Sequence, residues 1–232
     1  MSKNADHYKK IVDYYKERYS ATAPISASMI IQVNSDGLYK RFNRSAFDFD
    51  ITEALIRSTH ELIGRISGFK LAYVKPSTIT IYAQSKHSVW QQNDIVKIAS
   101  ASASVVTRAF DRNYEHHSNP IFTAKAFCLP YNNVTDVFVH CAKSWEKASI
   151  QTYCTQLHRK PEVEPLTTAE RLDLIAKAGG HWFDDLCEYK KFGTFIIAES
   201  SNSSITRTDI EPNFTSINNL LIEYDMLNAT GE

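Results

Sequence analysis

MIIQVNSDGLYKR, residues Met29–Arg41, carries the clearest structural signal in this chain of 232 residues. Its apolar first part predicts a buried strand over Met29–Val33. Asp36 and Gly37 follow, and glycine permits the sharp backbone turn that ends such a strand. We therefore expect a central strand that presents a carboxylate at one end of a sheet.

A second stretch, KLAYVKPSTITIYA at 70–83, predicts a hairpin beside this strand. β-Branched and aromatic residues dominate its two arms, 70–74 and 79–83, as they do in strands. Between the arms, Lys75-Pro76-Ser77-Thr78 has the composition of a tight turn. The turn contains no acidic residue, so Asp36 has no carboxylate opposite it on the hairpin.

Hydrophobic periodicity predicts the elements around these strands. We expect helices at 5–19, at 51–66 with Asp50 as its cap, and at 92–110, and a fourth strand at 121–129. The order strand, helix, strand, strand, helix, strand is typical of an α+β, ferredoxin-like antiparallel sheet with two helices on one face. Further helices are expected at 133–159 and 167–177, and a last strand at 192–199.

The run SSNSS at 200–204 indicates a boundary in the chain. We predict a domain over residues 1–199, with a helical extension, and an acidic C-terminal tail over 200–232. The tail is interpreted as a flexible appendage or as an arm that docks on a neighbouring subunit.

The composition restricts the class of protein. Lys and Arg total 26 and so do Asp and Glu, so the summed charge does not indicate a nucleic-acid binder, although a local basic groove is compatible with it. No apolar run approaches the ~20 residues needed to span a bilayer, so we expect no membrane attachment and a cytoplasmic location. The four cysteines lack the spacing of a zinc site and are expected to be free, mostly buried thiols.

Several short motifs, in order, resemble the tRNA-His guanylyltransferase family, whose members add nucleotides in the 3′-to-5′ direction. The segment 34–38, NSDGL, resembles the family's Arg-Leu-Asp-Gly-Arg, and the hairpin segment 72–78 resembles its Ala-Tyr-Gly-Gln-Ser-Asp-Glu. The segments 46–48, 97–100 and 122–125 are similar to its Pro-Phe-Asp, Lys-x-x-Ser and Phe-Asp-Gly-Arg elements. The resemblance covers residues 8–199 and implies a palm-type domain.

In that family, two Mg²⁺ ions bind the Asp and the carbonyl of the Asp-Gly pair, here Asp36 and Gly37, together with a hairpin Asp. The resemblance aligns the hairpin Asp with Ser77 and the neighbouring Glu with Thr78. A hydroxyl is a weak, neutral ligand for Mg²⁺, and the lost carboxylate would have offset the repulsion between two dications. We therefore expect a metal to bind only by way of Asp36, brought in with a nucleotide.

The resemblance also implies a site for GTP or ATP, whose candidate residues are Asp48, Lys75, Ser77, Thr78, Lys97 and Ser100. Three of them have a simpler interpretation as well. Asp48 could cap the following helix, and Lys75 and Lys97 could be solvated surface lysines. As a bare dipeptide, Asp36-Gly37 could be an ordinary turn.

Three hypotheses follow. The first is a member of this group that has lost two-metal catalysis and acts as a non-catalytic binding or scaffold subunit, in an oligomer with itself or with an active relative. The second is a divergent, active nucleotidyltransferase that uses GTP or ATP on tRNA or another RNA end. The third is a protein-interaction module whose acidic tail engages a basic partner.

Overall fold

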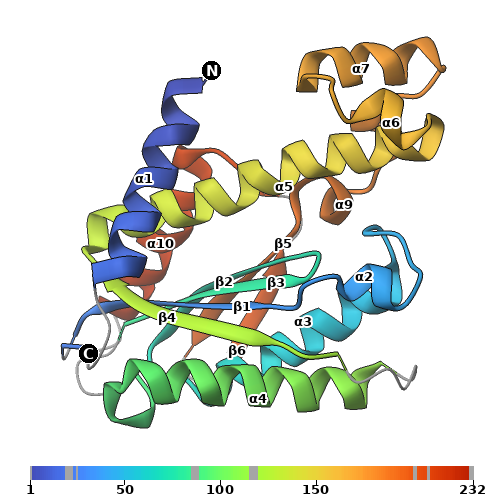
Figure 1. Ribbon diagram of the computed structural model, residues 1–232. Coiled ribbons are helices and arrows are strands. Elements are labelled where there is room, and N and C mark those ends of the chain that lie inside the picture. The colour runs from blue at the N-terminus through green and yellow to red at the C-terminus, as the bar shows by residue number, and fades with distance from the viewer. Residues whose placement is uncertain are drawn as a thin grey trace.

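The computed structural model describes residues 2–18, 23–24, 26–84, 89–114, 120–200, 203–207 and 210–229 (Figure 1). Within these ranges, six strands form one sheet in the order β4-β1-β3-β2-β5-β6, and all neighbouring strands are antiparallel. The strands are β1 (Ser28–Asn34), β2 (Phe69–Lys75), β3 (Thr78–Ala83), β4 (Thr123–Leu129), β5 (Thr194–Ser200) and β6 (Ser203–Arg207). The helices are α1 (Ser2–Arg18), α2 (Leu38–Arg41), α3 (Phe49–Ile63), α4 (Ile95–Asn113), α5 (Val134–Leu157), α6 (Lys160–Val163), α7 (Thr168–Lys177), α8 (Trp182–Asp185), α9 (Glu188–Phe192) and α10 (Phe214–Ala229).

The first four strands with α3 and α4 form the predicted ferredoxin-like unit, so the expected fold class is confirmed. Both helices lie on one face of the sheet (Figure 1). Because side chains alternate along a strand, Met29, Ile31 and Val33 of β1 all point to this face. They pack with apolar residues of α3 and α4, such as Leu55 and Phe110, in the larger core.

The opposite face of the sheet carries α1, α5 and α10 (Figure 1). Ile30 of β1, Tyr73 of β2 and Phe127 of β4 point to this side and pack against Val137 and Phe138 of α5. The sheet is therefore covered on both faces, and β1 and β3 at its centre are almost wholly buried. No helix in the described ranges is long and apolar enough to cross a bilayer.

The segment after residue 199 differs from the predicted tail where the structure describes it. β5 runs through Ser200 and pairs with β2, and β6 pairs with β5. α10 then packs on the sheet beside α5 and buries Ile217, Leu220 and Leu221. Most acidic side chains of this segment lie outside the described part, so a role as an arm toward a neighbouring subunit stays a prediction.

α5 extends beyond the sheet, and α6–α9 pack around its second half (Figure 1). The members of this third apolar cluster are Phe47, Trp145, Ile150, Cys154, Val163, Ile175, Trp182, Leu186 and Phe192. The predicted helix at 167–177 is confirmed as α7, and it begins with a capping box in which Thr167 and Glu170 form both hydrogen bonds. The prediction of free, mostly buried thiols is also confirmed, since Cys187 is exposed and the other three cysteines are buried.

Candidate functional site

Asp36 and the β2–β3 turn lie side by side at one end of the sheet. Asn34, the last residue of β1, pairs with Thr78 of β3, and the Ser35 amide donates a hydrogen bond to the Ser77 carbonyl over 2.9 Å. Asp36 is exposed just beyond this pair. The structure therefore brings together the strand end and the hairpin, as the sequence predicted.

Backbone conformation explains why the chain reverses at both points. Gly37 has a φ of 67° and precedes the short helix α2, a conformation that glycine adopts at no steric cost. Ser77 also has a positive φ, 64°, and follows Pro76, whose ring fixes the preceding turn position. The two turns place the Asp36 carboxylate and the Ser77 and Thr78 hydroxyls at the same end of the sheet.

The register places a polar row on the face that looks toward α5. At the Asp36 end, Thr123, Asn34, Thr78 and Lys75 are successive cross-strand neighbours on β4, β1, β3 and β2. The residues beside them that point to the other face, such as Val33, are apolar and packed on α3 and α4. All four members of the polar row are exposed or half-buried, so a ligand can reach them.

A second polar row lies two residues further along the strands. Lys125, Gln32, Thr80 and Tyr73 are its members, again in cross-strand order. Gln32 and Thr80 are buried, and their side chains lie 3.5 Å apart and within hydrogen-bonding distance of Cys141 Sγ on α5. Lys125 is exposed at the outer strand and was missing from the predicted site, because its neighbours become evident only from the strand register.

The residues at this end do not fit a two-metal site. Asp36 contributes a carboxylate, while Ser77 and Thr78 contribute neutral hydroxyls. Among the described residues, no group of three or more His, Cys, Asp or Glu residues is arranged to hold a metal ion. Mg²⁺ prefers carboxylate and phosphate oxygens in near-octahedral geometry, which this set of donors does not supply.

Asp48, a predicted nucleotide contact, is the N-cap of α3. Its Oδ1 accepts a hydrogen bond from the Ile51 amide over 3.0 Å, and its Oδ2 lies 3.7 Å from Arg44 Nε. Asp50, the predicted cap, instead lies in the first turn of the helix. The helix begins two residues earlier than expected because Asp48, with its extended backbone, is the residue that satisfies the free amide. The contacts favour the capping interpretation of Asp48.

Lys97 and Ser100 lie away from the Asp36 end. They belong to the first two turns of α4, which begins where β3 has ended, at the opposite end of the sheet. Thr107, ten residues after Lys97, is the part of α4 that reaches the Asp36 end, where its hydroxyl accepts a hydrogen bond from the Phe122 amide. Ten helical residues span ~15 Å, so the structure does not bring Lys97 and Ser100 to the other candidates. Lys97 is also paired with Asp94, the cap of α4, at 3.4 Å.

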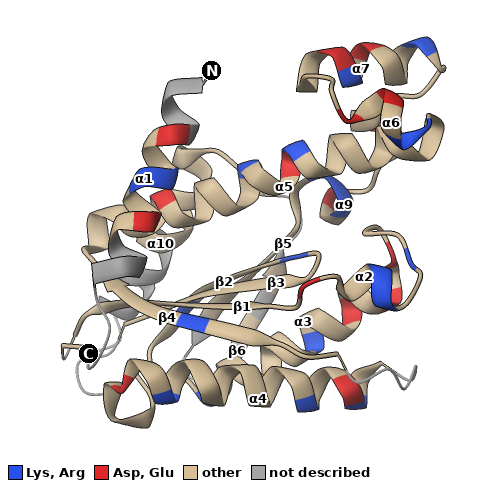
Figure 2. Ribbon diagram, viewed as in Figure 1, with Lys and Arg blue, Asp and Glu red and all other residues tan. Residues whose placement is uncertain are grey.

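The charge around the site is unevenly compensated. Figure 2 shows basic residues on β4, the β2–β3 hairpin and α9 around the acidic residue that follows β1. Three carboxylates near the site are paired: Glu146 of α5 with Lys143, Glu188 of α9 with Lys191, and Asp48, the N-cap of α3, with Arg44. Among the described residues, Lys75 and Lys125 have no ion-pair partner.

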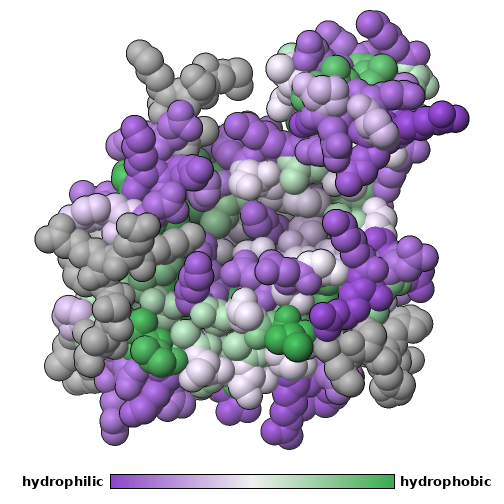
Figure 3. All heavy atoms as spheres, in the orientation of Figure 1, coloured by the Kyte–Doolittle hydropathy of each residue, from purple (hydrophilic) through white to green (hydrophobic). Residues whose placement is uncertain are grey.

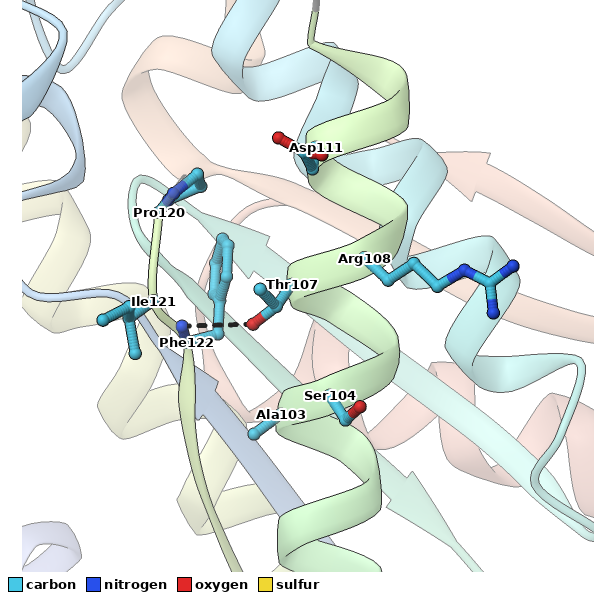
Figure 4. A pocket seen from close by; sticks show the side chains of 8 residues that line it. All are labelled: Ala103, Ser104, Thr107, Arg108, Asp111, Pro120, Ile121 and Phe122. Atoms are coloured by element: carbon cyan, nitrogen blue, oxygen red, sulfur yellow. Dashed lines mark hydrogen bonds between the residues drawn. The ribbon is translucent and has the colours of Figure 1, made fainter. Parts of the chain in front are cut away.

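A separate hollow of about 530 Å³ lies between α4 and residues 120–122 (Figure 4). Its lining residues are Ala103, Ser104, Thr107, Arg108, Asp111, Pro120, Ile121 and Phe122. Arg108 points away from the 120–122 segment, so the polar groups do not converge on a common point (Figure 4). None of the predicted site residues lines it, and we do not regard it as the functional site.

No protein-family model matches this chain, and no curated protein sequence matches it. Solved structures do resemble it. A bacterial tRNA(His) guanylyltransferase-like protein in complex with ATP has a TM-score of 0.77 and 23% identity, over 93% of this chain and 98% of that one. Such a protein in complex with GTP has a TM-score of 0.65 and 22% identity over the same shares.

The tRNA(His) guanylyltransferase of Saccharomyces cerevisiae has a TM-score of 0.68 and 11% identity, over 84% of this chain and 94% of that one. At these identities the likeness concerns the fold. The chain thus has the palm-type fold of these proteins over nearly its whole length, as the sequence motifs predicted.

Proposed function

We propose that this protein is a degenerate member of the tRNA-His guanylyltransferase group that binds a nucleotide at the Asp36 end of its sheet and does not transfer it. In this role it is a non-catalytic binding or scaffold subunit. The observation that carries the proposal is the pair of hydroxyls, Ser77 and Thr78, beside the strand that leads to Asp36. The family resemblance requires carboxylates at these two positions.

The chemical reason lies in the charge that phosphoryl transfer needs. Two divalent ions a few ångströms apart repel each other, and bridging carboxylates offset that repulsion and orient the attack. Replacing the hairpin carboxylates with hydroxyls leaves Asp36 as the remaining candidate ligand. The likeness in fold to proteins described in complexes with ATP and GTP supports a nucleotide as the ligand.

A second candidate function is a divergent, active nucleotidyltransferase acting on tRNA or another RNA end. The exposure of Asp36 at the expected place on the sheet favours it, because a nucleotide triphosphate could bring a metal to this carboxylate. The two candidate functions make different predictions for nucleotide transfer. The active enzyme would transfer nucleotide with Mg²⁺ and would need Asp36 to do so, whereas the non-catalytic subunit would not transfer it.

The test measures incorporation of labelled GTP and ATP into tRNA ends with Mg²⁺, for the natural protein and for Asp36→Ala. We expect no transfer above background in either protein. Transfer by the natural protein that is lost in Asp36→Ala would overturn the proposal and establish the active alternative.

Restoring the carboxylates provides the positive control. We expect Ser77→Asp combined with Thr78→Glu to gain a magnesium-dependent thermal stabilisation by GTP, because ligand binding stabilises the native state by RT ln(1 + [L]/Kd). Aspartate tolerates the positive φ of position 77 better than most residues, so the variant should fold. Val96→Glu combined with Ser104→Asp adds the same charge at two exposed positions of α4 and should gain nothing.

The proposal includes partners. A subunit without catalysis acts through what it binds, so we propose an RNA ligand related to tRNA and assembly with further copies or with an active relative. Light scattering of the purified protein, alone and mixed with tRNA, measures both. If the protein were a monomer and formed no complex with tRNA, the proposed function would reduce to nucleotide binding alone.

A further inference from the structure

Lys75 occupies a position that the family resemblance assigns to a glutamine, directly before the turn that lacks carboxylates. It is the last residue of β2, it is half-buried, and no described carboxylate pairs with it. Its cross-strand neighbour is Thr78, which in turn pairs with Asn34. The loss of negative charge and the gain of positive charge therefore occur at adjacent positions on one hairpin.

Lys125 presents a second ammonium group to the same face. It is exposed on β4 and lies opposite Gln32 of β1, two residues along the strand from the polar row. β4 and β2 are separated by two strands, about 14 Å, and Lys125 is also offset by about 7 Å along the strand, so the two lysine backbones are roughly 16 Å apart. Lysine carries its charge on a flexible four-carbon stem, so both side chains can converge on an anion between them.

The part of the polar row between the two lysines carries uncharged hydrogen-bond donors. Asn34 and Thr78 are half-buried, and Thr123 is exposed beside them. A row of hydrophilic side chains crosses the middle of the view in Figure 3, among side chains of intermediate hydropathy. Hydroxyl and amide groups can bond phosphate oxygens without adding charge. Three described carboxylates in this region, Glu146, Glu188 and Asp48, already have basic partners, so they do not cancel the two lysines.

We propose that this end of the sheet binds the polyphosphate group of a nucleotide directly, with Lys75 and Lys125 supplying the positive charge that divalent metal ions would otherwise supply. The inference rests on the proposed function, since it assumes that nucleotide is held here without transfer. It adds that binding is independent of metal. In that case the Asp36 carboxylate weakens binding, because it repels the phosphate charges directly when no metal ion lies between them.

Asp36 gives the two modes of binding opposite signatures. If metal mediates binding, Asp36→Asn weakens it, because the metal loses its carboxylate ligand. If lysines bind the phosphates directly, Asp36→Asn leaves binding equal or tighter, because a repulsive charge has gone. The sign of this one change separates the mechanisms without any assay of catalysis.

Calorimetric titrations with GTP, ATP and inorganic triphosphate, each in EDTA and in Mg²⁺, test the inference. We expect all three ligands to bind in EDTA, with affinity that falls as salt is raised. Lys75→Met and Lys125→Met should each weaken binding about tenfold, as the loss of one charge-assisted contact does. Lys97→Met, at the other end of the sheet, should have no effect.

Each outcome is decisive. Binding that requires Mg²⁺ and is weakened by Asp36→Asn would overturn the inference and leave nucleotide binding itself intact. Binding of GTP in EDTA that inorganic triphosphate does not displace, or that Lys75→Gln leaves unchanged, would show that the base and not the phosphates is recognised, and would also overturn it. No binding of any ligand would end both this inference and the nucleotide part of the proposed function, while the transfer assay would still report on catalysis.

Discussion

Gly193 sets the position of α9 through the space that its missing side chain leaves. It has a φ of 80°, and a Cβ atom there would lie 2.5 Å from the Tyr73 hydroxyl oxygen. That hydroxyl donates a hydrogen bond to the Phe192 carbonyl over 2.8 Å. The end of α9 therefore closes directly onto the ring of Tyr73, two residues before Lys75 in β2.

We expect Gly193→Ala to lower the free energy of unfolding by about 3 kcal/mol or more, because it combines a strained φ with an overlap that the buried ring cannot escape. Gly179→Ala is the matched control. Gly179 has the same φ of 80° but open space around its Cβ position, so only the backbone cost of about 1–2 kcal/mol applies. Urea denaturation of both variants measures the difference. Equal losses would mean that contact with Tyr73 does not matter.

Among the single residues of the candidate site, the sequence predicted Asp36 and the hairpin turn but not Lys125 on β4. Asp36 and Ser77 could be placed together because each ends or turns a strand with a strong local signal. Lys125 could not, since its face and its neighbours depend on the register between β4 and β1, and a slip of one residue would turn it into the core.

His60 links two elements that are far apart in the chain. It lies on α3, and its two ring nitrogens are each 3.2 Å from a hydroxyl of β6, those of Ser204 and Thr206. Burial lowers the pKa of His60 below its ordinary value of 6.5, and the nearby Glu53 carboxylate opposes that shift only in part. The neutral ring is thus the form that holds β6 beside α3.

The lowered pKa makes stability depend on pH in a defined direction. Because the folded protein binds this proton less readily than the unfolded chain does, the free energy of unfolding should fall as pH decreases below 6.5, and level off below the folded pKa. His60→Gln keeps a side chain with donor and acceptor groups but cannot titrate. Denaturant titrations at several pH values from about 8 to 5 measure the free energy of unfolding. Its change with pH should be smaller in His60→Gln than in the natural protein. If the free energy of unfolding changed with pH equally in both proteins, His60 would have the same pKa in the folded and the unfolded state.

The elements that the sequence missed are those whose signal depends on a neighbour. β6 has the sequence SSITR, which is short and mostly polar, and it forms on an edge that β5 provides. The first four strands are rich in apolar, β-branched and aromatic residues, so their existence could be predicted without reference to one another. α4 was expected to begin at Gln92, yet it begins at Ile95, because Asp94 is the cap that satisfies its first amides.

At the scale of the whole molecule, α10 is part of the domain, and point changes can test this. Ile217 of α10 is wholly buried against the α5 side of the sheet, whereas Ile222 on the same helix is 42% exposed. We expect Ile217→Ala to cost about 2–5 kcal/mol, because it leaves a cavity in a packed core. Ile222→Ala should change stability by no more than about 0.5 kcal/mol.

Thermal and urea unfolding of the two variants check this prediction. If both changes proved equally mild, residues 214–229 would be an independent appendage, which is one of the two interpretations of the predicted tail. The run SSNSS that indicated a boundary includes the last residue of β5 and the first two of β6, and these two strands pair with each other.

The order of the strands also determines how the chain can fold while it is being made. Met29 of β1 pairs with Ala83 on one side and with Cys128 on the other, so the centre of the sheet cannot close until β4 has left the ribosome. The outer edge of β2 stays unpaired until β5 has been synthesised, and β5 follows some of the longest helices of the chain. Pairing between such distant segments is slow, and an open apolar edge can pair with another chain in the meantime. The period between the synthesis of β3 and that of β5 is therefore when a chaperone would protect this protein most.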